Sequence, residues 1–185
     1  MKRYQKNDYP VDAVRRYLEP GPIVLVSSSW QGKHNIMTMG WHMMIRYQSF
    51  ACYIWDANHS FGMLRNSQAC VINLPTVDIV DTVVDIGNCS GADVDKFARF
   101  GLTAKPAEQV EAPLIDECYA NFECRLADAS QIDGHGLFIW DIVKAHVAVS
   151  PTQPKTIHYQ GDGDGEFMVA GESISRRDRF KPDKL

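Results

Sequence analysis

The sequence has no long apolar run and no large excess of charge of one sign. Its 19 Lys and Arg residues stand against 23 Asp and Glu residues, a formal net charge of −4. This balance excludes the basic footprint of a nucleic-acid-binding protein and the polybasic anchor of a membrane-bound one. No apolar stretch approaches the length of a bilayer span, and the charged residues 1–8 lead into no apolar core. We therefore expect neither a membrane segment nor a signal peptide.

Cysteine pairs with the spacing of metal ligands are also missing. The five cysteines include no Cys-x-x-Cys pair, and His135 and His146 have no clustered partners. This usage predicts buried thiols in a reducing compartment, hence a cytoplasmic protein, rather than a disulfide frame or a zinc site. The run Asp162–Glu166 has the carboxylates but not the spacing of a calcium loop, so we expect a turn there and no bound metal. No Gly-x-Gly-x-x-Gly motif follows a strand, which excludes a Rossmann-type nucleotide site.

What the chain does contain is a succession of strands. Its 185 residues predict a single domain, with a core of about residues 18–150 and a C-terminal extension of residues 151–185. The predicted strands are residues 23–28, 35–41, 49–55, 68–74, 120–127 and 136–149, and the predicted helices are residues 9–18, 61–65, 76–86 and 90–100. Such a succession predicts a mainly β protein, a closed or nearly closed antiparallel barrel with short helical insertions.

The stretch from Asn35 to Trp41, Asn-Ile-Met-Thr-Met-Gly-Trp, carries the most chemistry. Its apolar residues surround a lone Thr38 and Gly40, which fits a largely covered strand with a glycine where something approaches the backbone. Asn35 and Thr38 offer hydrogen-bonding groups to a flat polar ligand, and Trp41 offers a large ring beside it. On this strand alone, we favour an ordinary barrel strand whose threonine faces water.

Other segments follow this stretch in a fixed order. They are His59-Ser60-Phe61-Gly62, Val71-Ile72-Asn73-Leu74-Pro75, Ser90-Gly91 with Asp95-Lys96-Phe97, Ala112-Pro113-Leu114-Ile115 with Glu117-Cys118, and Phe122-Glu123-Cys124. With these motifs, the sequence from about Pro20 to Val149 resembles the flavin reductase-like family with the FMN-binding split-barrel fold, most closely its flavoredoxin branch.

The resemblance implies a fold, a cofactor and an assembly. It implies a six-stranded split antiparallel β-barrel and a homodimer with one FMN per subunit, bound noncovalently near the subunit interface; FAD is the alternative flavin. It also implies redox chemistry, in which NADH or NADPH reduces the flavin, or electrons pass through FMN to a protein partner.

The resemblance assigns the ring system of the flavin to the stretch from Asn35 to Trp41. Asn35, Ile36, Met37 and Thr38 are expected to run along the ring and to hydrogen-bond its polar edge, partly through backbone groups. Trp41 is expected to pack beside the ring, and a plain core tryptophan is the alternative.

Two further segments are expected to bind the phosphate. His59 and Ser60 stand at a predicted helix start, where N–H groups and a hydroxyl suit a phosphate, although an ordinary N-cap is the alternative for Ser60. Ser90 and Gly91 would allow close approach, and Lys96 would supply positive charge. The alternative for Lys96 is a surface ion pair with Asp93 or Asp95, and Cys89 beside this loop is either a redox thiol or a small buried group.

Three functions are compatible with these residues. We rank an NAD(P)H-dependent flavin reductase first, possible partner of a monooxygenase, because the flavin does the chemistry and no catalytic acid–base pair is required. An FMN electron carrier with protein partners comes second, and a flavin-binding module without turnover third.

Overall fold

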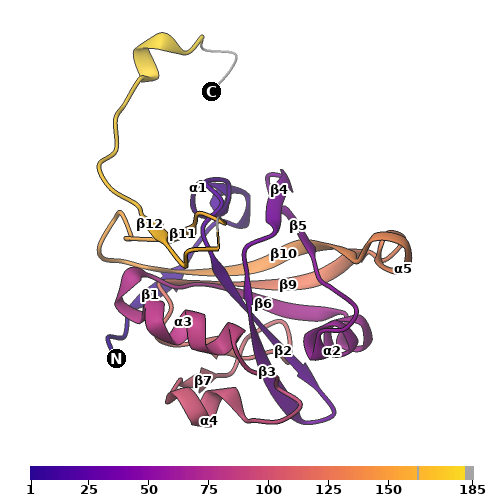
Figure 1. Ribbon diagram of the computed structural model, residues 1–185. Helices are drawn as coiled ribbons and strands as arrows, with labels where there is room; N and C mark the ends of the chain where they lie inside the picture. Colours follow the sequence, from indigo (N-terminus) through magenta and orange to yellow (C-terminus); the bar gives the residue numbers. More distant parts are fainter. Residues whose placement is uncertain (162, 182–185) are drawn as a thin grey trace.

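The chain folds into one curled antiparallel sheet with helices on its outside (Figure 1). The computed structural model describes residues 1–161 and 163–181. The large sheet contains β1 (Lys6–Asp8), β2 (Val24–Trp30), β3 (Lys33–Met39), β4 (His42–Arg46), β5 (Ser49–Tyr53), β6 (Ala69–Leu74), β9 (Ala120–Asp128) and β10 (Leu137–Ala148). The helical segments are η1 (Val11–Ala13), α1 (Arg15–Leu18), α2 (His59–Ser67), η2 (Val77–Ile79), α3 (Val80–Gly87), α4 (Lys96–Phe100), α5 (Ile132–His135) and η3 (Arg177–Arg179).

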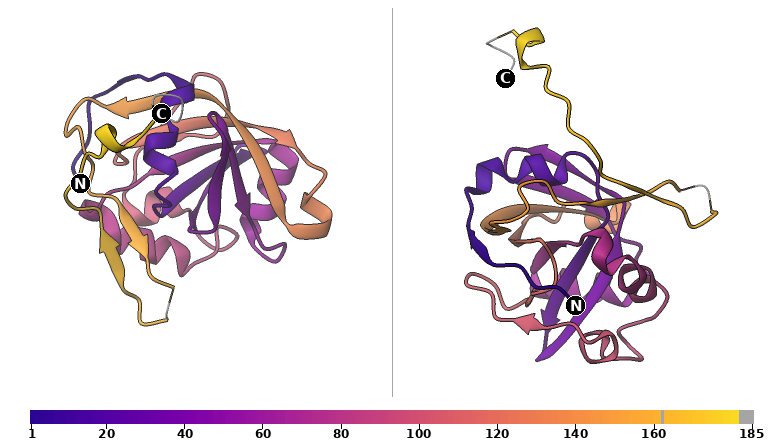
Figure 2. Two further views of the ribbon diagram at one scale, coloured as in Figure 1. Left: turned by 90° about the horizontal axis from the view of Figure 1, so that it is seen from above. Right: turned by 90° about the vertical axis from the view of Figure 1, so that its left-hand side faces the viewer.

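The strand order explains how the sheet becomes a barrel. The order is β3-β2-β6-β9-β10-β5-β4, with β1 added on β10, and every pair in it is antiparallel. β3 and β4 stand at opposite ends of this order, yet only residues 40 and 41 separate them in the chain. The sheet must therefore wrap around its interior to bring its ends together, as the view from above shows (Figure 2). The predicted mainly β, split antiparallel barrel is confirmed.

Two strands of the sheet were not predicted. The six predicted strands correspond to β2, β3, β5, β6, β9 and β10, whereas β1 and β4 are additional. β1 is three polar residues, Lys-Asn-Asp, and joins the sheet by pairing with the long β10. β4 carries apolar side chains that face solvent, so the burial pattern that marks a strand in the sequence is missing.

The β2–β3 hairpin is apolar on both faces because both faces are covered. Along β2, Val24 and Val26 point into the barrel core, whereas Leu25 points outward into a second core beneath α3 and α4. β3 continues the pattern, with Met39 in the barrel core and Ile36, 0% exposed, in the second core. Replacing such a fully buried Ile by Ala costs about 2–5 kcal/mol, so this hairpin is a main source of stability.

The outer helices differ from the prediction in their boundaries. The predicted helix of residues 76–86 is split into η2 and α3, and that of residues 9–18 into η1 and α1. α4 begins at Lys96 rather than near Ser90 or Asp93, because the carboxylate of Asp95 caps it by accepting the Ala98 N–H at 3.1 Å. Gly101, with φ of +61°, ends α4 in the left-handed conformation.

The sequence shows no clustered partner for His146, but folding gives it a buried hydrogen-bond partner. His146 Nε2 lies 2.8 Å from Oε1 of Glu123, which is 0% exposed and also accepts the N–H groups of Glu108 and Gln109. Burial raises the pKa of Glu123, but these hydrogen bonds and the histidine outweigh it and leave the pKa below its ordinary value. His135, by contrast, is exposed at the end of α5.

The C-terminal extension packs on the barrel and then leaves it. Strands β11 (Ile157–Tyr159) and β12 (Phe167–Val169) form a hairpin anchored by buried Ile157, whose carbonyl accepts the Ile23 N–H at 2.8 Å. β7 (Ala104–Lys105) and β8 (Leu114–Ile115) form another small hairpin. Beyond residue 170 the chain runs away from the body (Figures 1 and 2). Asp162 of the predicted turn and residues 182–185 of the basic ending lie outside the described residues.

No helix in the described part of the chain is both long and apolar enough to cross a membrane.

Candidate functional site

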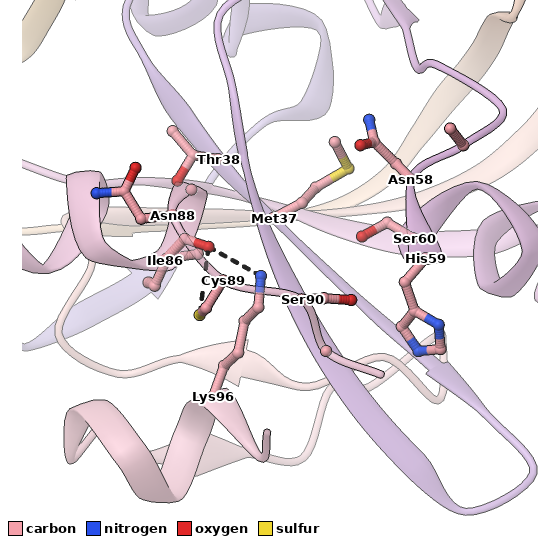
Figure 3. Close-up of a pocket in the computed structure, with 13 residues that line it drawn as sticks. Met37, Thr38, Asn58, His59, Ser60, Ile86, Asn88, Cys89, Ser90 and Lys96 are labelled. Atoms are coloured by element: carbon pink, nitrogen blue, oxygen red, sulfur yellow. Dashed lines mark hydrogen bonds between the residues drawn. The ribbon is translucent and has the colours of Figure 1, made fainter. Parts of the chain in front are cut away.

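A cavity of about 300 Å³ opens between β3, the start of α2 and the segment that follows α3. Figure 3 shows side chains converging on it from these three elements and, with Lys96, from the start of the helix Lys96–Phe100. Its walls are formed by Met37, Thr38, Ala57, Asn58, His59, Ser60, Ile86, Gly87, Asn88, Cys89, Ser90, Gly91 and Lys96. Seven of the ten residues predicted from the sequence are in this wall, namely Met37, Thr38, His59, Ser60, Ser90, Gly91 and Lys96. The structure therefore brings together most of what the motifs named.

The other three predicted residues lie elsewhere. Asn35 is buried directly behind the wall, between Ser60 and Gly91. Ile36 is in the second core, so only its backbone belongs to the site. Trp41 is 74% exposed and rests against the Tyr53 ring, with ring centroids 5.4 Å apart, outside the cavity wall. The alternative that Trp41 is a core tryptophan is wrong.

Thr38 is held by a helix rather than by solvent. Its hydroxyl donates to the Val83 carbonyl of α3 at 2.6 Å, and the side chain is partly buried. The expectation of a barrel threonine facing water is therefore wrong. Because its hydroxyl proton is already donated to α3, Thr38 can offer a ligand its backbone groups and the lone pairs of its hydroxyl oxygen as acceptors.

Asn35 ties together the two predicted phosphate-binding segments. Its Nδ2 donates to Ser60 Oγ at 2.8 Å, while its Oδ1 is buried and has no hydrogen-bond partner among the described residues. A Cβ added to Gly91 would lie 2.0 Å from Asn35 Oδ1 and 2.6 Å from its Cγ. Gly91 is therefore a glycine because the side chain of Asn35 presses against it.

Lys96 reaches into the cavity from α4. It is only 4% exposed, and its Nζ donates to the Ile86 carbonyl at 2.9 Å (Figure 3). The alternative of a surface ion pair with Asp93 or Asp95 is wrong, since the lysine is buried and forms no ion pair within the described residues. Burial lowers the pKa of Lys96, and the neighbouring Cys89 acts in the opposite direction. A buried ammonium without a carboxylate is costly, so this site favours an anionic ligand.

Cys89 shares the carbonyl that Lys96 uses. Its Sγ lies 3.8 Å from the Ile86 oxygen, and its side chain is half-buried in the cavity wall (Figure 3). The other four cysteines are buried, as their lack of pairing predicted. Cys89 is thus a thiol placed inside the candidate site.

The start of α2 forms the opposite side of the cavity from Lys96 (Figure 3). Asn58 occupies the N-cap position, but its side chain accepts none of the N–H groups of the first turn. These N–H groups and the positive end of the nine-residue helix suit an anion. Ser60 is 5% exposed and accepts from Asn35, whereas His59 is exposed at the rim. Ser60 is thus the second residue of α2, and the N-cap alternative for it is wrong.

The sequence reasoning did not assign Ala57, Asn58, Ile86, Gly87 and Asn88 to this site. Ala57 and Asn58 lie on the segment that leads into α2, and the other three lie at the end of α3 and just after it, where no side-chain pattern marks a site. One group there is the backbone carbonyl of Ile86, which accepts a hydrogen bond from the Lys96 ammonium.

A second group of potential metal ligands lies away from this cavity. Asp8, Glu108 and His146 have ligand atoms within 4.8 Å of one another. Lys144 Nζ contacts both carboxylates, at 2.8 Å from Asp8 and 3.2 Å from Glu108. The lysine thus supplies the positive charge that a metal would bring.

Comparison with known proteins decides the family. The family model for a flavin reductase like domain matches residues 15–164. This chain belongs to the flavin reductase-like family. Among its relatives, the uncharacterized protein YddH of Escherichia coli K12 is 28% identical over 176 residues, which cover 86% of this chain and 92% of YddH. An uncharacterized protein of Archaeoglobus fulgidus is 29% identical over 129 residues, 69% of this chain and 72% of the relative.

Solved structures agree with this assignment. An FMN-binding domain of a flavin reductases-like enzyme from Shewanella baltica has a TM-score of 0.85 at 22% identity, covering 95% of this chain and 99% of that one. Flavoredoxin of Desulfovibrio vulgaris (Miyazaki F) has a TM-score of 0.77 at 26% identity, covering 84% and 90%. The fold of this flavin reductase-like protein is thus shared, and its family supports flavin binding.

The residues that line the cavity fit FMN or the FMN portion of FAD. The buried Lys96 ammonium and the N–H groups at the start of α2 are donors for a phosphate or another anionic group. The Oδ1 of Asn35 lies close behind them. It has no hydrogen-bond partner within the described residues, and as an amide oxygen it can only accept a hydrogen bond. This donor-rich cavity beside an apolar-walled strand suits a ligand with a flat ring and an anionic tail.

Proposed function

We propose that this chain is an FMN-binding oxidoreductase of the NAD(P)H-dependent flavin reductase type. The observation that carries the proposal is the cavity where the buried Lys96, the start of α2 and strand β3 meet. Membership of the flavin reductase-like family supports it. When bound, the flavin itself accepts hydride and passes electrons on, and so no acid–base pair is needed from the protein.

The protein holds and orients the cofactor in this proposal. His59, Ser60 and the N–H groups at the start of α2, together with Ser90 and Lys96, bind the phosphate and its chain of hydroxyls. The backbone of Asn35 to Thr38 and the Met37 side chain border the ring. Asn35 keeps α2 and the 90–91 segment at a fixed separation, because its side chain contacts both. Backbone N–H groups that border the ring in a fixed position stabilise negative charge on the reduced ring.

The nicotinamide nucleotide is proposed to bind only transiently. The chain has no Gly-x-Gly-x-x-Gly motif, and the cavity is bordered by exposed residues such as His59 and Asn88. NADH or NADPH therefore reaches the flavin from the solvent side, and no separate Rossmann site is required. A monooxygenase or another redox protein is the proposed acceptor of the electrons.

A flavoredoxin-like electron carrier is the second candidate. Flavoredoxin of Desulfovibrio vulgaris is 26% identical over most of both chains, which favours this alternative. A carrier exchanges electrons with protein partners and does not need to react with a nicotinamide. A flavin-binding module without turnover is the third candidate.

We propose a homodimer built on the face of β4. Met43 and Ile45 of β4 are at least 40% exposed, and so are Trp41 and Tyr47, which flank the strand. Trp55, two residues beyond the end of β5, is 60% exposed. A row of large apolar side chains on a strand at the end of a sheet marks an interaction surface. A second copy covering this row is the expected occupant.

The deciding experiment is the visible absorption spectrum of the purified protein, followed by anaerobic addition of NADH and then NADPH. A yellow protein that bleaches quickly with either nucleotide supports the reductase. A yellow protein that only dithionite reduces supports the carrier or the module. A colourless protein that takes up neither FMN nor FAD would contradict the flavin-binding proposal.

A further inference from the structure

The chain ends in an arm that leaves the barrel. Residues 171–181, hereafter the arm, are all exposed, and the hydrogen bonds that they form within the described chain are to one another. Figures 1 and 2 show the arm leaving the body at the end that carries α1 and β4. An extended segment of this length spans at most about 36–40 Å, which is comparable with the diameter of a small domain. The arm is therefore long enough to reach a neighbouring molecule.

The tip of the arm, residues 176–181, is a short turn that presents an aromatic ring. η3 closes this turn, because the Arg179 N–H donates to the Arg176 carbonyl at 2.9 Å. Phe180 follows it and is 55% exposed. The arm has four basic and two acidic residues, in a chain whose net charge is −4. A large apolar ring flanked by arginines is typical of a docking segment rather than of a solvated tail.

A groove of about 490 Å³ lies at the same end of the molecule (Figure 1). It is formed by Glu19, which follows α1, by Met44, Ile45 and Arg46 of β4, and by Tyr47. Met44 packs against the barrel core, whereas Ile45 is 40% exposed. Most of the wall is apolar, and its charged groups are one carboxylate and one guanidinium. The groove adjoins the exposed apolar side chains that the proposed homodimer covers.

The tip and the groove are complementary in shape and charge. A phenyl ring such as that of Phe180 suits an apolar groove of this size. An arginine of the tip can pair with Glu19, while Asp178 of the same turn can pair with Arg46. Because a two-fold axis repeats every contact, two arms that cross it reach two grooves.

We propose that the tip of the arm docks in this groove on a second copy of the chain, with Phe180 in the groove and an arginine against Glu19. The proposal rests on the proposed homodimer at β4, to which it adds a reciprocal clasp. Residues 171–175 span the gap between the two bodies and stay exposed. The second copy is the favoured occupant because the arm points away from its own barrel (Figures 1 and 2).

Photochemical cross-linking between copies tests the proposal. Copies with Phe180→p-benzoylphenylalanine are mixed with wild-type copies labelled with heavy nitrogen, and native mass spectrometry confirms that mixed dimers have formed. After irradiation, peptide mass spectrometry locates the cross-links, and the label shows whether each one joins two copies. The matched control places the same photoreactive residue at Ile174, which is also exposed and lies on the arm but outside its tip.

The expected result is a link from the unlabelled tip to a heavy peptide that contains Glu19 or residues 44–47, with little such product from the Ile174 control. Phe180→Ala is expected to raise the dimer dissociation constant at least fivefold in sedimentation equilibrium, and Ile174→Ala to change it less than twofold. Links confined to one copy show that the arm occupies its own groove, and they overturn the proposal. Absence of any link to the groove, or an unchanged dissociation constant in Phe180→Ala, also overturns the clasp while leaving the dimer in place. A wild-type protein that is monomeric at micromolar concentration instead refutes the proposed homodimer.

Discussion

Asn35 and Lys96 show how single side chains shape the candidate site. Both are almost fully buried, at 2% and 4% exposure, and both connect elements distant in sequence. Asn35 links β3 to α2 and to Gly91, and Lys96 links α4 to the end of α3. Within residues 1–161 and 163–181, neither polar group has a partner for all of its hydrogen-bonding capacity, which is a stability cost that ligand binding can offset.

Lys96→Ala is expected to weaken FMN binding far more than riboflavin binding. Riboflavin lacks the phosphate, and hydrogen bonds to charged groups contribute about 1.5–3 kcal/mol, so roughly a 10- to 100-fold loss is expected for FMN alone. Titration of both ligands by flavin fluorescence measures the difference. Equal loss for the two ligands would make Lys96 a scaffold residue.

The stability cost of Lys96 is expected to depend on pH. Burial lowers its pKa from the ordinary 10.5 of the unfolded chain, so between the two values the unfolded state binds more protons. The free energy of unfolding of the ligand-free protein then gains a contribution that rises with pH across this window. Lys96→Met removes that contribution. Its stability relative to wild type should therefore be most favourable at pH 7 and decline toward pH 10, as urea unfolding can measure; a difference independent of pH would contradict the assignment.

Cys89 is expected to be the reactive thiol. It is half-buried at the cavity wall, whereas the other four cysteines are at most 1% exposed. A thiol reagent such as DTNB should label one thiol of the native, flavin-free protein rapidly, and Cys89→Ser should abolish that phase. FMN should slow it. Rapid labelling that persists in Cys89→Ser, or that FMN leaves unchanged, would place Cys89 outside the ligand site.

At the scale of elements, the site depends on how closely the segment after α3 packs on β3. Thr38 donates to α3, and Gly91 lies against Asn35, so the two elements approach within hydrogen-bonding and van der Waals contact. The same strand is apolar on its inner face and contacts the second core on its outer face. β3 therefore positions the site because it is held from both sides.

Gly91→Ala is expected to push these elements apart. The new Cβ would meet Asn35 Oδ1 at 2.0 Å, and such overpacking typically costs about 1–3 kcal/mol. Thermal unfolding and FMN titration should both show a loss. Gly134→Ala, where no atom lies within 4 Å, is the matched control. Adding Asn35→Ser to Gly91→Ala should recover part of the stability, and a double variant as unstable as the sum of its single changes would exclude this contact as the cause.

At the scale of the whole molecule, the curled sheet leaves one face of β4 uncovered. Trp41, Met43 and Ile45 are on that face, while His42 and Met44 of the same strand are partly buried. Side chains of β4 thus alternate between an exposed and a partly buried face, as in other strands, but the exposed face is the one that carries large apolar side chains. A second copy of the chain supplies the missing cover in the proposed homodimer.

Met43→Glu is expected to dissociate that dimer. A charge placed in the centre of an apolar interface loses its hydration without gaining a partner. Light scattering coupled to gel filtration should change from a dimer mass to the 20.8 kDa of one chain. Ile174→Glu, in the exposed tail, is the control. A wild-type protein that is already monomeric at micromolar concentration would contradict the proposal.

The sequence by itself determined the class of fold and most members of the site. Residues 23–28 are a continuous run rich in β-branched residues, and other short segments of strand length bounded by turn residues follow it, so six of the eight strands of the sheet were predictable. Ser60, Ser90 and Lys96 were named because the motifs that contain them resemble those of the flavin reductase-like family. These inferences depend on local preference and residue chemistry, which the sequence records directly.

Only the tertiary structure decided which groups those residues contact. Lys96 donates to a backbone carbonyl, and Trp41 lies outside the cavity. Gly91 leaves room for the Asn35 side chain, which a Cβ at that position would overlap. β1 and β4 exist because β10 and β5 offer edges to pair with, not because of their own sequences. Pairing between distant strands and burial by neighbouring elements are set by the closed sheet as a whole, and for that reason no local pattern in the chain could predict them.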